Sequence, residues 1–553
     1  MDKKTENSIN NRAMKIIVFF IMAFIMIVIR LFWIQLVKGQ EYRHEAEKQH
    51  IREIRVSPAR GNIFDRNNIQ LTNNTAEKTI YIFRDVVLKD SQILERIKET
   101  FNLSEKDIEI IKKSNNRIVE IPLGEVVEDN TFIKGIVIED RIIRYDGSNL
   151  LAHVIGYIKE SENIGEYGIE KEYDDILKMN ETSGIKYVTV DGKQRIIPGL
   201  NDTEAISEKR YVTNSIKLTV DIDMQKSVER VMDARKVNGA IVVTDVETGD
   251  ILAMASRPNL NQNNIKANFN SDDMDFYNKA IEVAYPPGSI FKIIVLLAAI
   301  EEDLSDIDDT FICEGYVDLG SFKIKCNNTD GHGELTVYKA FSESCNSVFI
   351  QIGQKVGAKK IINMAKKLGF GEKIQNILIE SRGNLPKNDE LLGPSIGNIS
   401  IGQSNIEVTP LQVSNMMMII VNDGVKREIG IVDSIVTEEG KFVKKVERAK
   451  EERVLPVDLC KQVKKCLEGV VDVGTAKNID MSNIGGAAGK TGSAENGKKN
   501  THAWFSGYFP RKNPRYVLTV FIEEGGSGSK TSVPIFEEVA KSIYSIEMNK
   551  KHK

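Results

Sequence analysis

The chain of 553 residues is longer than one ordinary hydrophobic core supports, so we expect two or more domains. Hydrophobic residues make up 41% and charged residues 28%, which is typical of a folded globular protein. The net charge of −4 shows no basic excess for binding nucleic acid, and five cysteines exclude a disulfide-dense secreted scaffold.

The first forty residues predict a membrane anchor. Residues 16–37 are almost wholly apolar, and 22 residues of helix can cross a bilayer core of roughly 30 Å. Four basic residues precede this run against two acidic ones, which predicts that residues 1–15 are cytoplasmic and that the chain after about residue 38 lies outside. A buried helix and a cleaved signal peptide are the alternatives, but no small-x-small cleavage site follows the run.

Residues 38–215 predict an accessory α+β domain. Residues 38–56 are charged and compatible with a helix, so we expect a stalk that leaves the membrane. Beyond it, short strand-like runs alternate with charged helical stretches, and no nucleophile stands beside a base.

Residues 216–548 predict a second domain, with strands at both ends and helices between them. Residues 239–256 contain two β runs joined at a turn, and the runs 502–510 and 515–523 predict a second hairpin before a final helix. We therefore expect an antiparallel sheet whose outer strands come from distant segments, with a helical subdomain inserted.

Ser289 and Lys292 form the first motif with catalytic chemistry. Pro286-Pro287-Gly288 and a following apolar run predict a helix that begins here, so both side chains should lie one turn apart on one face. A lysine with a lowered pKa can take the proton of a serine hydroxyl, and the helix N-terminus offers amide donors. Taken alone, the pair is a weak signal, because an isolated S-x-x-K is much more often a capping serine with a surface lysine.

Two further motifs follow downstream. They are Ser344-Cys345-Asn346 and Lys490-Thr491-Gly492-Ser493. The order S-x-x-K, S-x-N and K-T-G is typical of serine β-lactamases and penicillin-binding proteins.

Over nearly its full length the chain resembles the class B penicillin-binding proteins. Residues 60–67 (RGNIFDRN) resemble an element of their pedestal domain, and Gly168-Ile169-Glu170 resembles a second one. Residues 218–221 and 502–508 are similar to segments of their transpeptidase domain. One departure is Gly402-Gln403-Ser404, where the family usually has G-Q-G. The chain shows no glycosyltransferase motif, so it looks monofunctional.

The resemblance implies a peptidoglycan D,D-transpeptidase that is a target of β-lactams. Ser289 would attack the D-Ala-D-Ala carbonyl of one stem peptide with Lys292 as general base, and an amine of a second stem peptide would resolve the acyl-enzyme. The other implied roles are Ser344 as proton relay, Asn346 as holder of the substrate amide, Lys490 as source of positive potential, Thr491, Gly492 and Ser493 as the carboxylate-binding segment, and the backbone amides of Ser289 and Ser493 as oxyanion hole.

The resemblance also implies the architecture and the partners. We expect a transmembrane helix, an elongated α+β pedestal of dimerisation type (38–215), and a transpeptidase domain (216–548) with a five-stranded antiparallel sheet flanked by helices plus a helical subdomain. The implied partners are stem peptides, β-lactams and a SEDS-family glycosyltransferase in the membrane, and the pedestal allows a homodimer. The location would be the cell membrane, with the catalytic domain extracellular.

Cys313, Cys326, His332 and Cys345 lie within 33 residues and form a Cys₃His set suited to tetrahedral zinc. The alternatives are free thiols beside a hydrogen-bonded histidine, or a Cys313–Cys326 disulfide. If the second motif is extended, Cys345 points away from its two neighbours and toward the metal. The set is also similar to a zinc-binding element of elongation-type and some sporulation-type family members. We therefore expect structural Zn²⁺ and no organic cofactor.

Other functions share part of this pattern. A serine β-lactamase has the first and third motifs but needs neither anchor nor pedestal, and it would turn penicillin over. A D,D-carboxypeptidase differs only in using water as acceptor. A β-lactam sensor needs an intracellular effector, for which 15 cytoplasmic residues leave no room, and a non-catalytic scaffold need not keep all three motifs.

Overall fold

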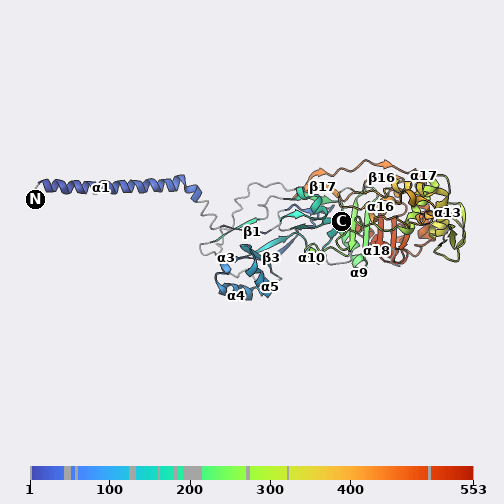
Figure 1. Ribbon diagram of the computed structural model, residues 1–553, viewed down its shortest axis with the longest axis horizontal. Helices are drawn as coiled ribbons and strands as arrows, with labels where there is room; N and C mark the ends of the chain where they lie inside the picture. The colour runs from blue at the N-terminus through green and yellow to red at the C-terminus, as the bar shows by residue number, and fades with distance from the viewer. Residues whose placement is uncertain are drawn as a thin grey trace. The chain divides into compact units, whose positions relative to one another are not determined.

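The computed structural model divides the chain into two compact units (Figure 1). One comprises residues 1–58, 76–143 and 182–210, and the other comprises 59–75, 144–181 and 211–553. The described residues are 3–42, 51–56, 60–123, 133–159, 162–178, 185–190, 214–268, 274–320, 323–375, 377–495 and 500–551.

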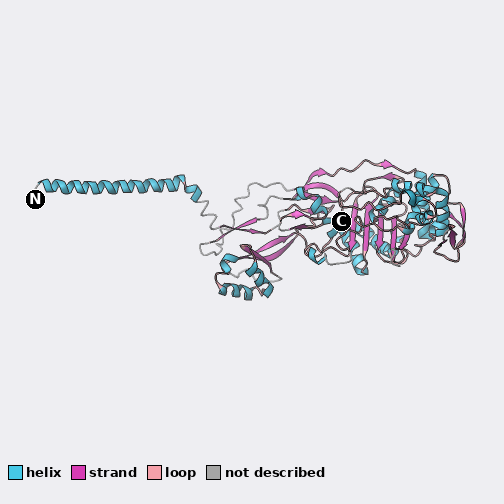
Figure 2. Cartoon of the chain, viewed as in Figure 1, coloured by secondary structure: helices cyan, strands magenta, loops and turns pink. Residues whose placement is uncertain are grey.

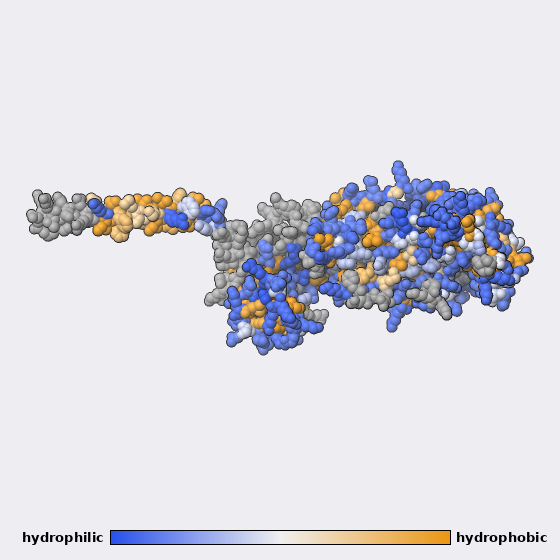
Figure 3. Space-filling view, in the orientation of Figure 1, coloured by the Kyte–Doolittle hydropathy of each residue, from blue (hydrophilic) through white to orange (hydrophobic). Residues whose placement is uncertain are grey.

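The apolar segment predicted to form a helix, residues 16–37, lies within one longer helical segment that begins at Lys3. Helix α1 (Lys3–Phe32) continues into a π-helical turn, η1 (Trp33–Val37). Its apolar stretch Met14–Val37 has 24 residues and would be about 36 Å long as a helix. Large apolar side chains cover its surface (Figure 3), and none of the described parts of the chain buries them. This helix fits a single-pass membrane anchor.

The first unit contains a three-stranded sheet of order β4-β3-β5. Strand β3 (Thr75–Phe83) alternates its side chains between two apolar clusters, because successive residues of a strand point to opposite faces. Ile80 and Ile82 pack with helices α4 (Ser91–Thr100) and α5 (Glu105–Lys113), whereas Tyr81 and Phe83 belong to the other cluster. The neighbouring strands are β4 (Ile118–Pro122) and β5 (Ile136–Ile143).

The predicted helical stalk is wrong at its end. Residues Ile51–Arg55 form strand β1, which pairs antiparallel with β8 (Ile185–Thr189). The Tyr81 hydroxyl donates to the Arg55 carbonyl at 2.6 Å. The segment has the sequence I-R-E-I-R, and its Ile54 is buried beside Val188. Pairing with β8 therefore makes it a strand, although its charged composition had suggested a helix.

The second unit is built on a five-stranded antiparallel sheet of order β11-β10-β22-β21-β20, which confirms the predicted sheet and both hairpins (Figure 2). The two outermost strands come from segments more than 200 residues apart, as expected. The strands are β10 (Gly239–Asp245), β11 (Ile251–Arg257), β20 (Ala488–Glu495), β21 (Thr501–Phe509) and β22 (Tyr516–Ile522).

Helices cover both faces of this sheet. Ser414 of α16 (Pro410–Val421) meets Thr519 on one face, with 3.2 Å between their hydroxyl oxygens. Phe536 of α18 (Ser532–Lys551) stacks edge-on against Phe505, which pairs with the residue after Thr519 and so belongs to the other face. Helix α9 (Ile222–Arg235) packs beside α18.

The remaining elements of the second unit form the helical insertion and small sheets. A four-stranded sheet has the order β18-β17-β9-β2. The helices of the insertion are α11 (Lys292–Glu301), α12 (Val337–Ser342), α13 (Asn346–Val356), α14 (Ala358–Lys367), α15 (Ser395–Ser400) and α17 (Val457–Asp472), and the strands are β2 (Ile63–Phe64), β9 (Asn214–Leu218), β12 (Thr310–Cys313), β13 (Tyr316–Asp318), β14 (Lys323–Lys325), β15 (Gly333–Thr336), β17 (Val432–Thr437) and β18 (Phe442–Lys445).

A buried ion network joins the two elements that resemble the pedestal. Arg60 Nε lies 2.5 Å from Glu170 Oε2, and Arg144 Nε lies 2.7 Å from Glu170 Oε1. The Tyr145 hydroxyl donates to the same carboxylate at 3.0 Å. These side chains are buried. The single carboxylate of Glu170 compensates the charges of both guanidinium groups.

Candidate active site

Ser289 lies on a tight turn that opens onto a helix. The 3₁₀ turn η3 (Gly288–Phe291) leads directly into α11, so Ser289 and Lys292 are one turn apart, as predicted. Gly288 has φ +53°, and a Cβ there would lie 2.5 Å from the Ser493 carbonyl oxygen. Only glycine therefore lets this turn approach strand β20. Ser289 itself is half-buried.

The loop after α15 supports this turn from the other side. The Gly288 amide donates to the Gly402 carbonyl at 3.0 Å, and a Cβ on Gly402 would lie 2.1 Å from the Gly288 oxygen. Ser404, where the resembled family has glycine, keeps the left-handed conformation with φ +79°. The loop thus retains a backbone shape that glycine adopts more easily.

Lys292 is fully buried and points at the second motif. Its Nζ donates to the Ser344 carbonyl and to Asn346 Oδ1, both at 2.7 Å, and lies 3.3 Å from Ser344 Oγ. Burial lowers the pKa of Lys292 to about 8, although negative charge on Cys345 and Cys326 opposes the shift. A lysine with such a pKa is partly neutral near physiological pH and can accept a proton.

The second motif is a turn and not the extended segment that we expected. Ser344 has φ +57°, and Cys345 is the cap that precedes helix α13. The expected outcome nevertheless holds for the side chains, because Ser344 and Asn346 face Lys292 while Cys345 packs with the other cysteines. The left-handed conformation of Ser344 directs the Cys345 side chain away from its two neighbours, which is the result expected of an extended segment.

The third motif lies on β20, the edge strand of the five-stranded sheet. Lys490 is fully buried, and its Nζ lies over the Phe341 ring, 5.4 Å from the centroid. Burial, together with repulsion from Lys292, lowers the pKa of Lys490 well below its ordinary value. Two buried lysines that repel each other favour a state in which only one carries a proton.

The two hydroxyls of the third motif each have a neighbour. Ser493 Oγ accepts from the Gly528 amide at 3.2 Å, and Thr491 Oγ1 lies 2.6 Å from Thr475 Oγ1. Close passage of β20 beneath the serine turn depends on Gly492, whose Cβ would lie 2.9 Å from the Pro287 carbonyl oxygen. Nothing in the pattern of the sequence singled out Thr475 or Gly528, because both reach the site from loops outside the motifs.

The fold therefore brings the three motifs together. Lys292 contacts Ser344 and Asn346, and the residue before Ser289 packs on Ser493. Such a site holds a serine, a candidate base and paired hydroxyls beside positive charge, a combination suited to acyl transfer on a substrate with a carboxylate.

The four predicted metal ligands also meet. One ligand atom from each residue lies within 4.8 Å of the others. Cys326 Sγ is 3.6 Å from Cys345 Sγ, and the His332 Nδ1 atom lies 3.4 Å from Cys313 Sγ and 3.6 Å from Cys326 Sγ. All five cysteines of the chain are free thiols in the structure, so the alternative Cys313–Cys326 disulfide is not formed.

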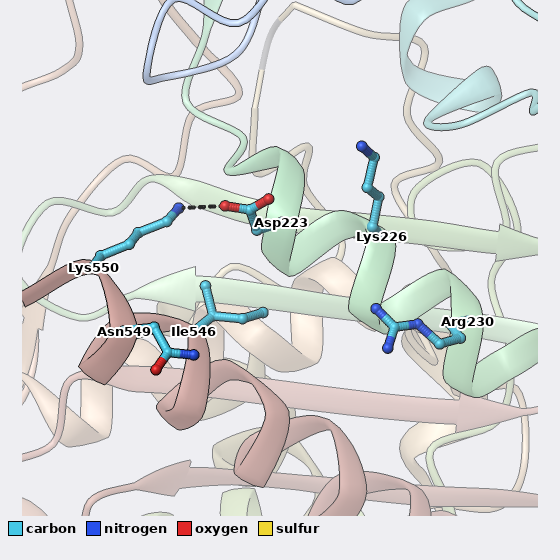
Figure 4. Close-up of a pocket in the computed structure, with 6 residues that line it drawn as sticks. All are labelled: Asp223, Lys226, Arg230, Ile546, Asn549 and Lys550. Atoms are coloured by element: carbon cyan, nitrogen blue, oxygen red, sulfur yellow. Dashed lines mark ion pairs between the residues drawn. The ribbon is translucent and has the colours of Figure 1, made fainter. Parts of the chain in front are cut away.

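A separate hollow of about 450 Å³ lies between α9 and α18 (Figure 4). Lys550 pairs there with Asp223 at 3.1 Å. The hollow contains no residue of the three motifs, and so it is not the candidate active site. Its lining consists of Asp223, Lys226, Arg230, Ile546, Asn549 and Lys550.

Comparison with known protein families matches both halves of the chain. Residues 239–541 match the penicillin-binding protein transpeptidase domain, which is more than half of the sequence. The chain belongs to the penicillin-binding proteins. Residues 55–213 match the penicillin-binding protein dimerisation domain, so this penicillin-binding protein has the class B arrangement. The assignment confirms the predicted α+β fold and the predicted enzyme class, a serine-type D-Ala-D-Ala transpeptidase.

Two relatives and one solved structure align with most of this chain and with most of their own length. It is 28% identical to stage V sporulation protein D of Bacillus subtilis, over 93% of this chain and 82% of the relative. It is 26% identical to the peptidoglycan D,D-transpeptidase MrdA of Haemophilus influenzae, over 92% and 88%. The structure of a complex between a penicillin-binding protein (PBP2) and MreC from Helicobacter pylori shares the fold, with a TM-score of 0.64, 23% identity, and coverage of 90% and 99%.

Proposed function

We propose that this protein crosslinks peptidoglycan stem peptides through an acyl-enzyme on Ser289, with Lys292 as the general base. The observation that carries the proposal is the state of Lys292, which is fully buried, has a lowered pKa and lies one helical turn from the serine. A buried lysine that is held by Ser344 and Asn346 has no role in solubility, and its desolvation favours the neutral form that a base requires.

In the first step, Ser289 Oγ bonds to the carbonyl carbon of the penultimate D-Ala, and the bond to the terminal D-Ala nitrogen breaks. The proton of Ser289 passes to Lys292 Nζ, and Ser344 Oγ, 3.3 Å from that nitrogen, relays a proton to the leaving amine. An amine of a second stem peptide then attacks the ester and releases the serine. The amides of Ser289 and Ser493 stabilise the developing oxyanion.

The third motif binds the terminal carboxylate of the substrate. Thr491 and Ser493 donate hydrogen bonds to it through their hydroxyl groups, and Gly492 keeps the strand close to the serine turn. A bound carboxylate favours the proton on Lys490, and the resulting charge favours the neutral form of Lys292 because the two lysines repel each other. Substrate binding thus prepares the base. Asn346 holds the substrate amide.

A covalent label tests the nucleophile. Ser289→Ala is expected to abolish labelling of the full-length protein by a fluorescent penicillin. Ser395→Ala, which alters a serine at the start of another helix, α15, should label normally. Persistent labelling of Ser289→Ala contradicts the assignment. Crosslinking of lipid II by the protein with a partner polymerase then distinguishes transpeptidation from hydrolysis by water.

We also propose that Cys313, Cys326, His332 and Cys345 hold a structural zinc ion. Around a tetrahedral zinc with bonds of about 2.3 Å, two sulfur ligands lie about 3.8 Å apart, close to the observed 3.6 Å between Cys326 and Cys345. Three of the four donors are buried, and Cys345 directly joins Ser344 to Asn346. A bound ion would supply rigidity, so that the turn beside Lys292 keeps its shape.

Metal analysis tests the zinc proposal independently of activity. Protein purified under reducing conditions should contain close to one equivalent of zinc, and Cys313→Ser should lose it. Cys460→Ser, which alters a buried cysteine outside the cluster, should retain the metal. Less than a few tenths of an equivalent in the unaltered protein contradicts the proposal.

We further propose that the N-terminus is cytoplasmic and that the catalytic unit is extracellular. The basic excess before the apolar helix supports this orientation. A SEDS-family glycosyltransferase is the proposed membrane partner, and β-lactams are the proposed inhibitors. The Helicobacter pylori relative is in a complex with MreC, which makes an MreC-like protein a second candidate partner. Co-purification from membranes in detergent tests both partners.

A further inference from the structure

Thr475 connects the second and third motifs although it belongs to neither. It lies in the loop after α17, where its backbone amide donates to the Ser342 carbonyl at 3.1 Å. Its hydroxyl oxygen lies 2.6 Å from Thr491 Oγ1. The loop can approach α12 this closely because a Cβ on Gly474 would lie only 2.2 Å from the same Ser342 oxygen. Thr475 therefore forms hydrogen bonds with both the end of α12 and strand β20.

Carboxylate binding depends on which of the two hydroxyls, Thr475 or Thr491, donates the hydrogen bond between them. Within the described residues, each of these two threonine hydroxyls has only the other as hydrogen-bond partner. One proton lies between them and the second is free. A carboxylate can only accept hydrogen bonds. When it binds to Thr491, that residue must donate to it, so Thr475 must donate to Thr491.

Ser493 shows the same arrangement with a different donor. Its Oγ accepts from the Gly528 amide at 3.2 Å, which leaves its own proton available. A Cβ on Gly528 would lie 2.4 Å from the carbonyl oxygens of Gly492 and Trp504, so this backbone donor also depends on close packing. Each hydroxyl of the third motif thus has a neighbour that is able to donate to it.

We infer that Thr475 is a positioning residue for carboxylate recognition. Its hydroxyl donates to Thr491 Oγ1, holds the Thr491 proton toward the terminal carboxylate of the stem peptide or of a β-lactam, and polarises that hydroxyl. This inference rests on the proposed function, in which Thr491 binds the carboxylate. Thr475 touches no reacting atom and acts only through its neighbour.

The test compares a penicillin with its methyl ester as acylating agents of the full-length protein in detergent. The ester lacks the carboxylate, so the ratio of the two second-order acylation rate constants measures carboxylate recognition. Thr475→Val keeps the shape of the side chain but removes its donor. The variant is expected to lower the rate with the free acid about tenfold, because the charge-assisted hydrogen bond from Thr491 to the carboxylate is then lost. The rate with the ester should stay within about twofold, and Thr475→Ser should restore the acid rate to within about threefold.

Two further variants separate positioning from folding. Thr491→Val should lower the acid rate at least as much as Thr475→Val, and the double variant should be no slower than Thr491→Val alone, because both changes remove one interaction. Thr519→Val removes a buried hydroxyl of the same sheet, which lies 2.9 Å from Ser506 Oγ and 3.2 Å from Ser414 Oγ, and should leave the acid-to-ester ratio unchanged.

The inference is overturned if Thr475→Val slows acid and ester equally, or if it leaves the acid rate unchanged while Thr491→Val lowers it. If Thr491→Val itself changes nothing, the role proposed for Thr491 is wrong as well. Loss of labelling in Ser289→Ala is independent of all these outcomes.

Discussion

Replacing Glu170 by glutamine removes the only carboxylate that compensates Arg144 among the described residues. Arg144 is buried, and its Nη2 already lacks a hydrogen-bond partner. Arg60 keeps a second carboxylate, because its Nη1 lies 2.7 Å from Asp174. Breaking a buried ion pair from one side costs about 3–5 kcal/mol, and the glutamine oxygen can still accept one bond. We therefore expect a loss of about 3 kcal/mol in the free energy of unfolding.

The assay is thermal unfolding of the full-length protein in detergent. In a unit of several hundred residues, a loss of about 3 kcal/mol lowers the melting temperature of that unit by about 4 °C. Glu302→Gln is the control, because its pair with Lys360 is exposed, belongs to the same unit and should contribute about 0.5 kcal/mol or less. Adding Arg144→Met to Glu170→Gln should recover part of the loss, since it removes the uncompensated charge.

The stability difference between the unaltered protein and Glu170→Gln should decrease as the pH is lowered. Burial opposes ionisation of Glu170, but Arg144 and Arg60 outweigh it and hold the pKa of Glu170 below its ordinary value of 4.5. The carboxylate therefore stabilises the fold fully above about pH 4.5, and this contribution is lost as the pH falls through the lower, folded-state pKa. A melting temperature for Glu170→Gln within 1 °C of the unaltered protein at neutral pH would refute the reasoning.

Two further predictions concern the serine turn and its base. If neutral Lys292 is the base, a pKa of about 8 leaves about a tenth of it neutral at pH 7 and about nine tenths at pH 9, so the acylation rate constant for a penicillin should rise about tenfold between them; a flat profile contradicts this role. Gly402→Ala should slow acylation at least about tenfold, because its Cβ would displace the Gly288 carbonyl. Gly393→Ala is the control, because Gly393 is also left-handed but an added Cβ would contact no other atom. This variant should be acylated at the normal rate.

Much of this protein followed from local sequence patterns. The apolar run before residue 38, the two β-hairpins and the Pro-Gly signal before Ser289 depend on neighbours in the chain, so they could be predicted without tertiary contacts. The three motifs could be recognised because their residue types and order have few other uses. The Cys₃His set could be recognised for the same reason, and the fold does gather it.

Tertiary structure decided the features that depend on partners far away in the chain. Residues 51–55 became a strand because β8 pairs with them, and a left-handed Ser344 turned the second motif where extended alternation was expected. Nothing local shows that Arg60 and Glu170 share one buried network, or that Thr475 stands behind Thr491. The lowered pKa of Lys292 likewise arises from its burial, which only the assembled fold provides.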